Sequence, residues 1–104
     1  MTPKMKARWI KALRSGRYLQ CRHFAGQIID GKEHNCCLGV YARIAHCKTV
    51  DTVRMFVPRI NNECHTPLPD YIMPKDIQRI YAHMNDEGYT FAEIADAIEK
   101  DTRI

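Results

Sequence analysis

The stretch EHNCCLGVYARIAHC, residues 33–47, gathers three of the chain's five cysteines and two of its five histidines. Asn35 is placed to cap a helix that starts at Cys36. Apolar residues then recur at the spacing of one helical face: Cys37, Val40, Tyr41 and Ile44. We therefore predict a buried helix at the centre of the fold, with Gly39 allowing a neighbouring element to approach closely.

The chain before this helix predicts one more helix and an extended segment. Apolar residues at helical spacing indicate a helix over Lys4–Ser15, with Thr2 as its cap and Pro3 in its first turn. Residues 17–29 alternate in the manner of a strand, and the Asp30–Gly31 pair predicts the turn that follows.

The chain after the central helix predicts a second extended segment and two helices. Residues 50–60 are rich in β-branched and aromatic side chains, which favour a strand. Pro74 opens a helix that ends at the sequence NDEG, and Thr90 with Glu93 forms a capping box before the last helix. This order predicts an α+β fold. We expect a single small domain over residues 1–104, with an N-terminal helix, a short antiparallel sheet covered by helices, and a C-terminal helix hairpin.

The net charge of +4 is unevenly distributed. Residues 1–22 carry seven Lys or Arg and no acid, whereas residues 86–104 carry six acids and two basic residues. Two interpretations are open. The basic half forms a phosphate-binding surface, or the basic first helix packs beside the acidic last helix of its own or a neighbouring chain.

The sequence also indicates the cellular location of the protein. No apolar run reaches the roughly 18 residues of a membrane span, and the N-terminus lacks the apolar stretch of a signal peptide. We therefore expect a cytoplasmic protein with no membrane partner. In a reducing compartment its cysteines are core residues, ligands or nucleophiles rather than a disulfide framework.

The cysteines and histidines are residue types that bind metals, but their spacing in the sequence is not that of a metal site. No pair has the Cys-x2-4-Cys or His-x3-5-His spacing with which one short loop grips a tetrahedral ion. If a metal were bound, the set would be Cys21, His23, Cys64 and His65, brought together from the two extended segments. We expect no metal and no cofactor, because buried cysteine without a chemical role is common.

A cysteine nucleophile is a second possibility. Cys36 would lie at a helix N-terminus, where the helix dipole lowers a thiol's pKa, and His34 or His23 would have to act as the base. The favoured interpretation is that both Cys36 and Cys37 belong to the core. The chain is therefore expected not to be an enzyme.

The C-terminal hairpin contains a sequence pattern that is also found in DNA-binding units. The phrase GYTFAEIA resembles the sequence that precedes the recognition helix of a helix-turn-helix unit. The last helix, however, carries acidic residues that phosphates would repel: Glu93, Asp96, Glu99 and Asp101. We expect a capped helix hairpin instead.

A phosphate-bearing ligand is the fourth possibility. Cations, an aromatic ring and an amide meet where the first helix passes into the first strand: Lys11, Arg14, Arg17, Tyr18, Gln20, Arg22 and His23. Arginine forks suit phosphates, and tyrosine stacks on a base or ribose. Arg43, Arg54 and Arg59 could join this surface from elsewhere. There is no glycine-rich phosphate loop.

Stretches in the two halves of the chain together resemble a family of small bacteriophage and prophage proteins. They are WIKALRSGRYLQ with CCLGVYARIA in the first half, and YAHMNDEGYTFAEIADAIE in the last. The resemblance covers roughly half the chain, at both ends and in order, and does not include residues 48–73.

The resemblance implies a viral origin, and small phage proteins of this size often counter host defence. We therefore expect an anti-defence protein that acts by binding in the cytoplasm of the infected host. Sequestration of a nucleotide-type immune signal is the preferred version. The alternatives are an inhibitor that masks a host defence protein, such as a CRISPR or other nuclease effector, and a small nucleic-acid-binding protein. A homo-oligomer is plausible, because so small a fold rarely encloses a nucleotide alone.

Overall fold

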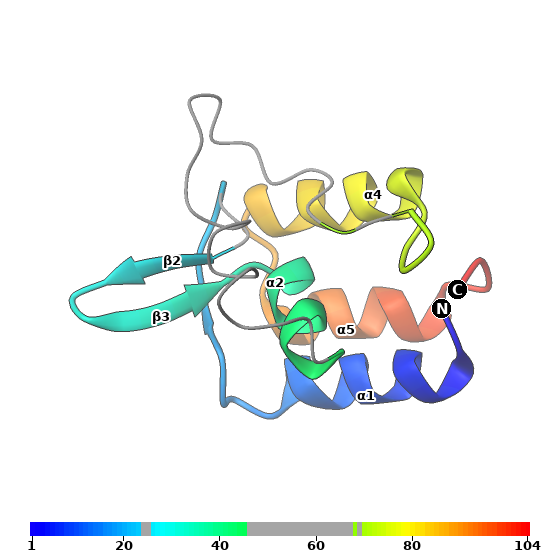
Figure 1. Cartoon of the computed structure of the whole chain (residues 1–104), viewed down its shortest axis with the longest axis horizontal. Helices are drawn as coiled ribbons and strands as arrows, with labels where there is room; N and C mark the ends of the chain where they lie inside the picture. The colour runs from blue at the N-terminus through cyan, green and yellow to red at the C-terminus, as the bar shows by residue number, and fades with distance from the viewer. Residues whose placement is uncertain (24–25, 46–67, 69) are drawn as a thin grey trace.

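The computed structural model describes residues 1–23, 26–45, 68 and 70–104 (Figure 1). Within them the chain forms a single α+β arrangement, as predicted, with an N-terminal helix and a C-terminal helix pair. The elements in order are α1 (Pro3–Arg14), β1 (Leu19–Gln20), β2 (Gly26–Ile29), β3 (Lys32–Asn35), α2 (Cys37–Ile44), α4 (Lys75–Asp86) and α5 (Phe91–Lys100). The strand predicted over residues 50–60 lies outside the described residues.

Helix α1 begins and ends where its sequence signals place it. The Thr2 hydroxyl accepts a hydrogen bond from the Met5 amide over 3.1 Å, and Pro3 occupies the first turn. The chain leaves the helix through Ser15 and Gly16, whose φ of +74° suits a residue without a Cβ. Trp9 and Leu13 form its buried face.

The sheet is mixed, with strand order β1-β3-β2. β2 and β3 are antiparallel and joined at Asp30 and Gly31, whose φ values of +52° and +75° confirm the predicted two-residue turn. β1, in contrast, pairs with β3 in parallel. The extended segment predicted over residues 17–29 is therefore divided into two strands. His23 lies between them with a φ of +69°.

Helix α2 confirms the predicted central helix but not its predicted cap. Asn35 is the last residue of β3, in register with Gln20 on one side and Gly26 on the other. Cys36 occupies the N-cap position and makes no capping hydrogen bond from its side chain. The prediction of an Asn35 cap is wrong because the sheet holds the Asn35 backbone in the strand. The first six residues of α2 are all buried.

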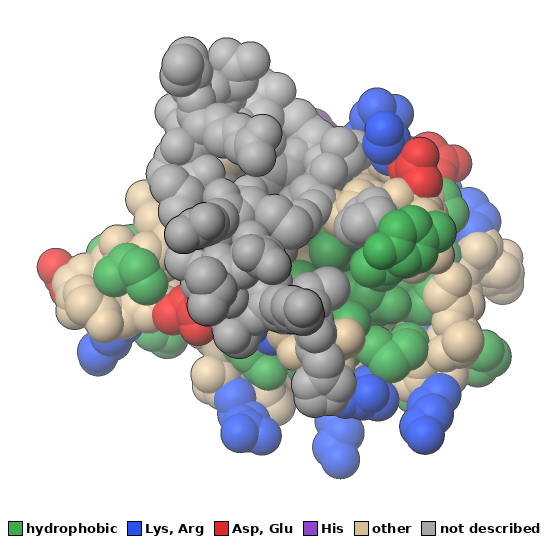
Figure 2. Space-filling view, in the orientation of Figure 1, with side chains coloured by type: hydrophobic (Ala, Val, Ile, Leu, Met, Phe, Trp, Pro, Cys, Tyr) green, Lys and Arg blue, Asp and Glu red, His purple; other side chains and the backbone are tan. Residues whose placement is uncertain are grey.

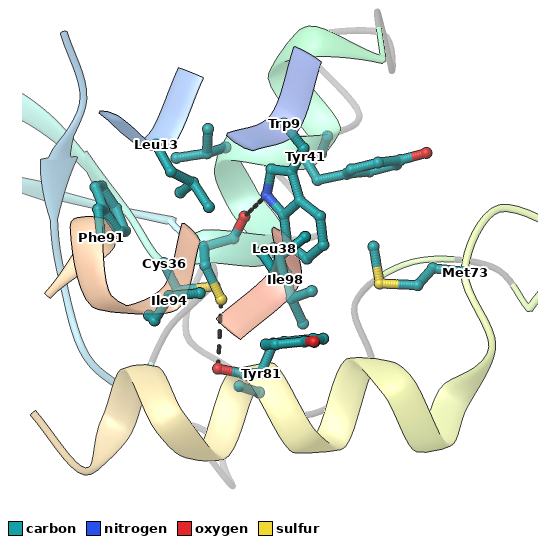
Figure 3. Close-up of a cluster of buried hydrophobic side chains, with 14 of the residues drawn as sticks. Trp9, Leu13, Cys36, Leu38, Tyr41, Met73, Tyr81, Phe91, Ile94 and Ile98 are labelled. Carbon is teal, nitrogen blue, oxygen red and sulfur yellow. Dashed lines mark hydrogen bonds between the residues drawn. The ribbon is translucent and has the colours of Figure 1, made fainter. Parts of the chain in front are cut away.

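The core is built around Trp9. Its ring meets Tyr41 and Tyr81 edge-on, with centroid separations of 5.3 and 5.7 Å, and its Nε1 donates to the Cys37 carbonyl oxygen over 2.8 Å. Figure 3 shows this hydrogen bond together with the apolar residues of α4 and α5 that close the cluster. The indole therefore joins α1 to the start of α2 and to α4.

The C-terminal hairpin places α5 between α4 and α1, and the chain termini lie close together (Figure 1). Thr90 and Glu93 form the predicted capping box, and Gly88 turns the chain between the helices with a φ of +104°. The β2–β3 hairpin projects to one side of the helices. None of the helices that the structure describes has the length and apolar character needed to cross a bilayer.

Candidate functional site

Arg14 is held by the last helix. Its guanidinium pairs with Asp96 over 2.7 Å and with Glu99 over 3.0 Å. These hydrogen bonds lower the pKa of Glu99 and raise the pKa of Arg14. Of the two interpretations of the charge asymmetry, this pairing supports the packing of the basic first helix beside the acidic last helix. Arg14 is less available to a ligand than the sequence predicted.

Gln20 is also engaged within the fold. Its Nε2 donates to Asn85 Oδ1 over 2.9 Å and to the Tyr89 carbonyl oxygen over 2.8 Å. The predicted use of this amide in a ligand site would require these hydrogen bonds to be broken. Gln20 instead joins β1 to the turn between α4 and α5.

Asn85 is a buried polar residue that the sequence did not single out. Its Nδ2 donates to the Cys21 carbonyl oxygen over 2.7 Å, and its Oδ1 accepts from the Cys37 amide over 3.2 Å. It belongs to the NDEG sequence at which α4 ends, as predicted: the helix runs through Asp86, and Glu87 is its C-cap. The periodicity of the sequence does not reveal that the Asn85 side chain will bridge segments that are distant in the chain.

Two other cations of the N-terminal segment also have internal partners. Lys6 Nζ donates to the carbonyl oxygens of Asp101 and Ile104, at 2.6 and 2.9 Å. Arg8 donates to the Ile44 carbonyl oxygen at 3.1 Å, yet the side chain stays exposed. Like Arg14, these residues tie α1 to neighbouring elements.

The remaining cations are exposed: Lys4, Lys11, Arg17 and Arg22. Within the described residues, no hydrogen bond or ion pair engages their side chains. Lys4 and Lys11 are seven residues apart, about 10.5 Å along the helix axis, on the side of α1 opposite Trp9 and Leu13. We call Lys4, Arg8 and Lys11 the basic ridge.

Figure 2 shows one face of the molecule with its basic and acidic side chains. Lys and Arg side chains line the edge of the molecule over α1, and Asp and Glu side chains lie elsewhere on that face. Helix α1 itself contains no acidic residue. The ridge is therefore a surface to which anions are attracted.

The other residues of the predicted ligand site are spread over the start of the sheet. Tyr18 is half-buried against the core, and His23 is exposed, with its backbone amide donating to Asp86 Oδ1 over 2.8 Å. Arg43 pairs with Glu33. Arg54 and Arg59 lie outside the described residues.

The described cysteines lie in the core. Cys21 is 4% exposed, and Cys36 and Cys37 are fully buried. Burial, and after it the neighbouring Cys36, raises the pKa of Cys21 to about 12. Cys37 Sγ donates to the Tyr81 carbonyl oxygen over 3.3 Å (Figure 3). Cys36 does lie at the start of α2, as predicted, but its burial separates the thiol from any substrate in solvent.

Residues that commonly bind metals do not cluster in the part of the chain that the structure describes. Residues 1–23, 26–45, 68 and 70–104 contain no group of three or more His, Cys, Asp or Glu placed to hold an ion. Of the hypothetical metal set, Cys21 is buried and His23 is exposed, while Cys64 and His65 lie outside the described residues.

An open depression lies at the α4–α5 turn, which the sequence did not predict. It is lined by His83, Met84, Glu87, Gly88, Tyr89 and Glu93. Its charged lining is acidic and thus unsuited to phosphate, in contrast to the basic ridge.

Comparison with known protein families identifies part of the chain. A family model described as a domain of unknown function (DUF8296) matches residues 1–55. No curated protein and no solved structure matches the chain. The matched part includes α1 with its basic ridge, the sheet and α2.

Proposed function

The chain belongs to the DUF8296 family, a domain of unknown function, and we propose that it acts by binding an anionic partner through the basic ridge. The observation that carries the proposal is the exposure of Lys4, Arg8 and Lys11 on a helix without acids. Such a surface accelerates encounter with an anionic partner and fixes its orientation.

We place this binding in phage counter-defence, following the resemblance to small phage proteins. The partner we favour is a host defence protein whose anionic surface is masked. The ridge is the convex outside of a helix, and it suits a broad surface better than an enclosed small molecule. The contact of Arg14 with Asp96 and Glu99 illustrates how α1 accommodates an acidic helix laid alongside it.

Sequestration of a nucleotide-type signal is the second candidate. It is favoured by the exposure of Arg17, Arg22 and His23, in the segment that the sequence singled out. Its support is smaller than the sequence implied, because Arg14 and Gln20 already have partners within the fold. We propose no catalytic step for either candidate.

Co-purification from bacterial host lysate tests the proposal. A tagged wild-type protein is compared with the variant Lys4→Gln/Lys11→Gln and with the control Lys75→Gln/Arg79→Gln, which removes two exposed cations from α4 instead. Each variant removes two positive charges from a net charge of +4. We expect a stoichiometric protein to be recovered with the wild type and the control, and in clearly smaller amount with the ridge variant. Equal capture by all three, or by none, would contradict the proposal.

Masking of a protein and sequestration of a nucleotide are distinguished by the molecule that remains bound to the purified protein. Native mass spectrometry detects a retained nucleotide, and calorimetry with cyclic nucleotides and ADP-ribose isomers measures its binding. Micromolar binding that is lost in an Arg17→Gln/Arg22→Gln variant would favour sequestration over masking. Binding to duplex DNA whose affinity falls steeply with salt would instead favour the nucleic-acid alternative.

A further inference from the structure

Cys21 and Cys36 directly follow the ends of the parallel strands β1 and β3. The register pairs Leu19 with His34 and Gln20 with Asn35, where both strands end, so the next residue of each segment is one of these cysteines. The Cys21 amide donates to the Asn35 carbonyl oxygen over 3.0 Å, which keeps the two chains together up to this point. The Cys36 backbone is still extended, with φ −80° and ψ 175°.

The spacing of such neighbours suits a disulfide. Adjacent strands lie about 4.8 Å apart, and disulfides join Cα atoms that are roughly 4.4–6.8 Å apart. Residues in register on adjacent strands also present their side chains to the same face of the sheet. The effect of Cys36 on the titration of Cys21 agrees with two thiols that lie close together.

Cys37 follows directly in sequence but has different surroundings. It is the first residue of α2, its amide donates to Asn85 Oδ1, and its Sγ donates to the Tyr81 carbonyl oxygen. It therefore belongs to the contact between α2 and α4 and serves as an internal control for the neighbouring pair.

We propose that Cys21 and Cys36 are a site of reversible oxidative modification, at which reaction with a low-molecular-weight disulfide forms a Cys21–Cys36 disulfide between the end of β1 and the start of α2. One cysteine thiolate attacks a sulfur of oxidised glutathione, forms a mixed disulfide and releases one glutathione thiolate. The second cysteine, as its thiolate, attacks the protein sulfur of that mixed disulfide and releases the second glutathione. Two protein thiols are oxidised and one glutathione disulfide is reduced to two thiols.

Access to the pair requires local opening. Both side chains are buried, and the raised pKa of Cys21 leaves little thiolate at neutral pH. β1 is only two residues long and forms one edge of the described sheet, so it can separate locally without unfolding of the core. The reaction is therefore expected to be slow at neutral pH and faster as the pH rises.

Peptide mapping of the oxidised wild-type protein tests the proposal. The native protein is incubated with oxidised glutathione, the remaining thiols are blocked with N-ethylmaleimide, and the protein is cleaved with trypsin. We expect residues 18–22 (YLQCR) to be linked to residues 33–43 (EHNCCLGVYAR). Fragmentation between the two adjacent cysteines should place the link on Cys36 and the blocking group on Cys37. Dithiothreitol should release the two peptides.

Other products would overturn the proposal. They include a link from Cys21 to Cys37, to Cys47 or to Cys64, a single glutathione adduct, and unmodified protein after prolonged incubation at raised pH. The same reaction in urea is the control for random pairing and should give a mixture. Cys37→Ala should still form the link and Cys36→Ala should not. The wild-type mapping decides the question even if a variant fails to fold.

Discussion

The side-chain amide of Asn85 replaces the backbone hydrogen bond that would come next between the segments of β1 and β3. Where the strands separate, its Nδ2 donates to the carbonyl oxygen of Cys21 and its Oδ1 accepts from the amide of Cys37. Gln20 adds a further hydrogen bond to Oδ1. One buried side chain from α4 thus pairs with backbone groups at the end of β1 and the start of α2.

Replacement of Asn85 is expected to be strongly destabilising. Asn85→Ala removes the buried hydrogen bonds to the Cys21 carbonyl and the Cys37 amide, at a cost of about 2–4 kcal/mol in the free energy of unfolding. Urea unfolding of the variant measures this loss, and His83→Ala, an exposed change on the same helix, is the control. A loss no larger than that of the control would show that Asn85 is not the link we describe.

Asp101 makes stability depend on pH. Hydrogen bonds from Arg103 and from the Tyr81 hydroxyl, the latter at 2.5 Å, hold the pKa of this carboxyl well below its usual range. Because the folded pKa is depressed, the stabilisation is present above the unfolded pKa of about 3.9 and is lost as pH falls toward the folded value.

The stability difference between wild type and Asp101→Asn should therefore shrink on acidification. We expect the wild type to be the more stable protein near pH 6, and the gap to narrow as pH falls from about 4 toward 2. Unfolding curves across this range provide the measurement, with Glu87→Gln as an exposed control. A gap that stays constant with pH would contradict the role given to Asp101.

At the level of elements, the start of α5 is held by its capping box. Thr90 Oγ1 accepts from the Glu93 amide over 3.2 Å, and Glu93 Oε1 accepts from the Thr90 amide over 3.0 Å. Thr90→Ala should lower the free energy of unfolding by about 1 kcal/mol, since it removes one cap bond and loosens the other. Thermal unfolding tests this, with Thr90→Ser as the conservative variant that should retain most of the stability.

Caps and turns that depend on residues close together in the sequence could be predicted from it. The Thr2 cap, the Asp30–Gly31 turn and the Thr90 capping box each depend on residues within a few positions of one another. The parallel pairing of β1 and the cap of α2 could not, because both depend on contacts between distant segments. The Asn35 backbone belongs to the sheet, and no local pattern reveals that.

The candidate site was predicted in part for the same reason. Composition correctly located the basic residues, and it named Lys11, Arg17 and Arg22, which are exposed. It could not show that Arg14 reaches α5 or that Gln20 reaches Asn85, since these contacts join residues more than 60 positions apart. Lys4 and Arg8 were not among the predicted ligand residues, because that site was placed where the first helix passes into the first strand.

Across the whole molecule, opposite charges lie on adjacent helices. The basic ridge faces solvent from α1, while the acids of α5 are partly neutralised by Arg14. An anionic partner is thus expected to approach over α1, away from α5. Its association should slow as salt is added, because the Debye length falls from about 10 Å at 0.1 M to about 3 Å at 1 M.

The affinity of the purified partner for the two matched charge variants tests the central claim most directly. Lys4→Gln/Lys11→Gln should weaken binding by roughly tenfold, as expected for two lost contacts of about 0.7 kcal/mol each. Lys75→Gln/Arg79→Gln, with the same loss of charge, should bind like the wild type. Equal weakening in both variants would show that only the net charge matters, and unchanged affinity in the ridge variant would show that the partner binds elsewhere.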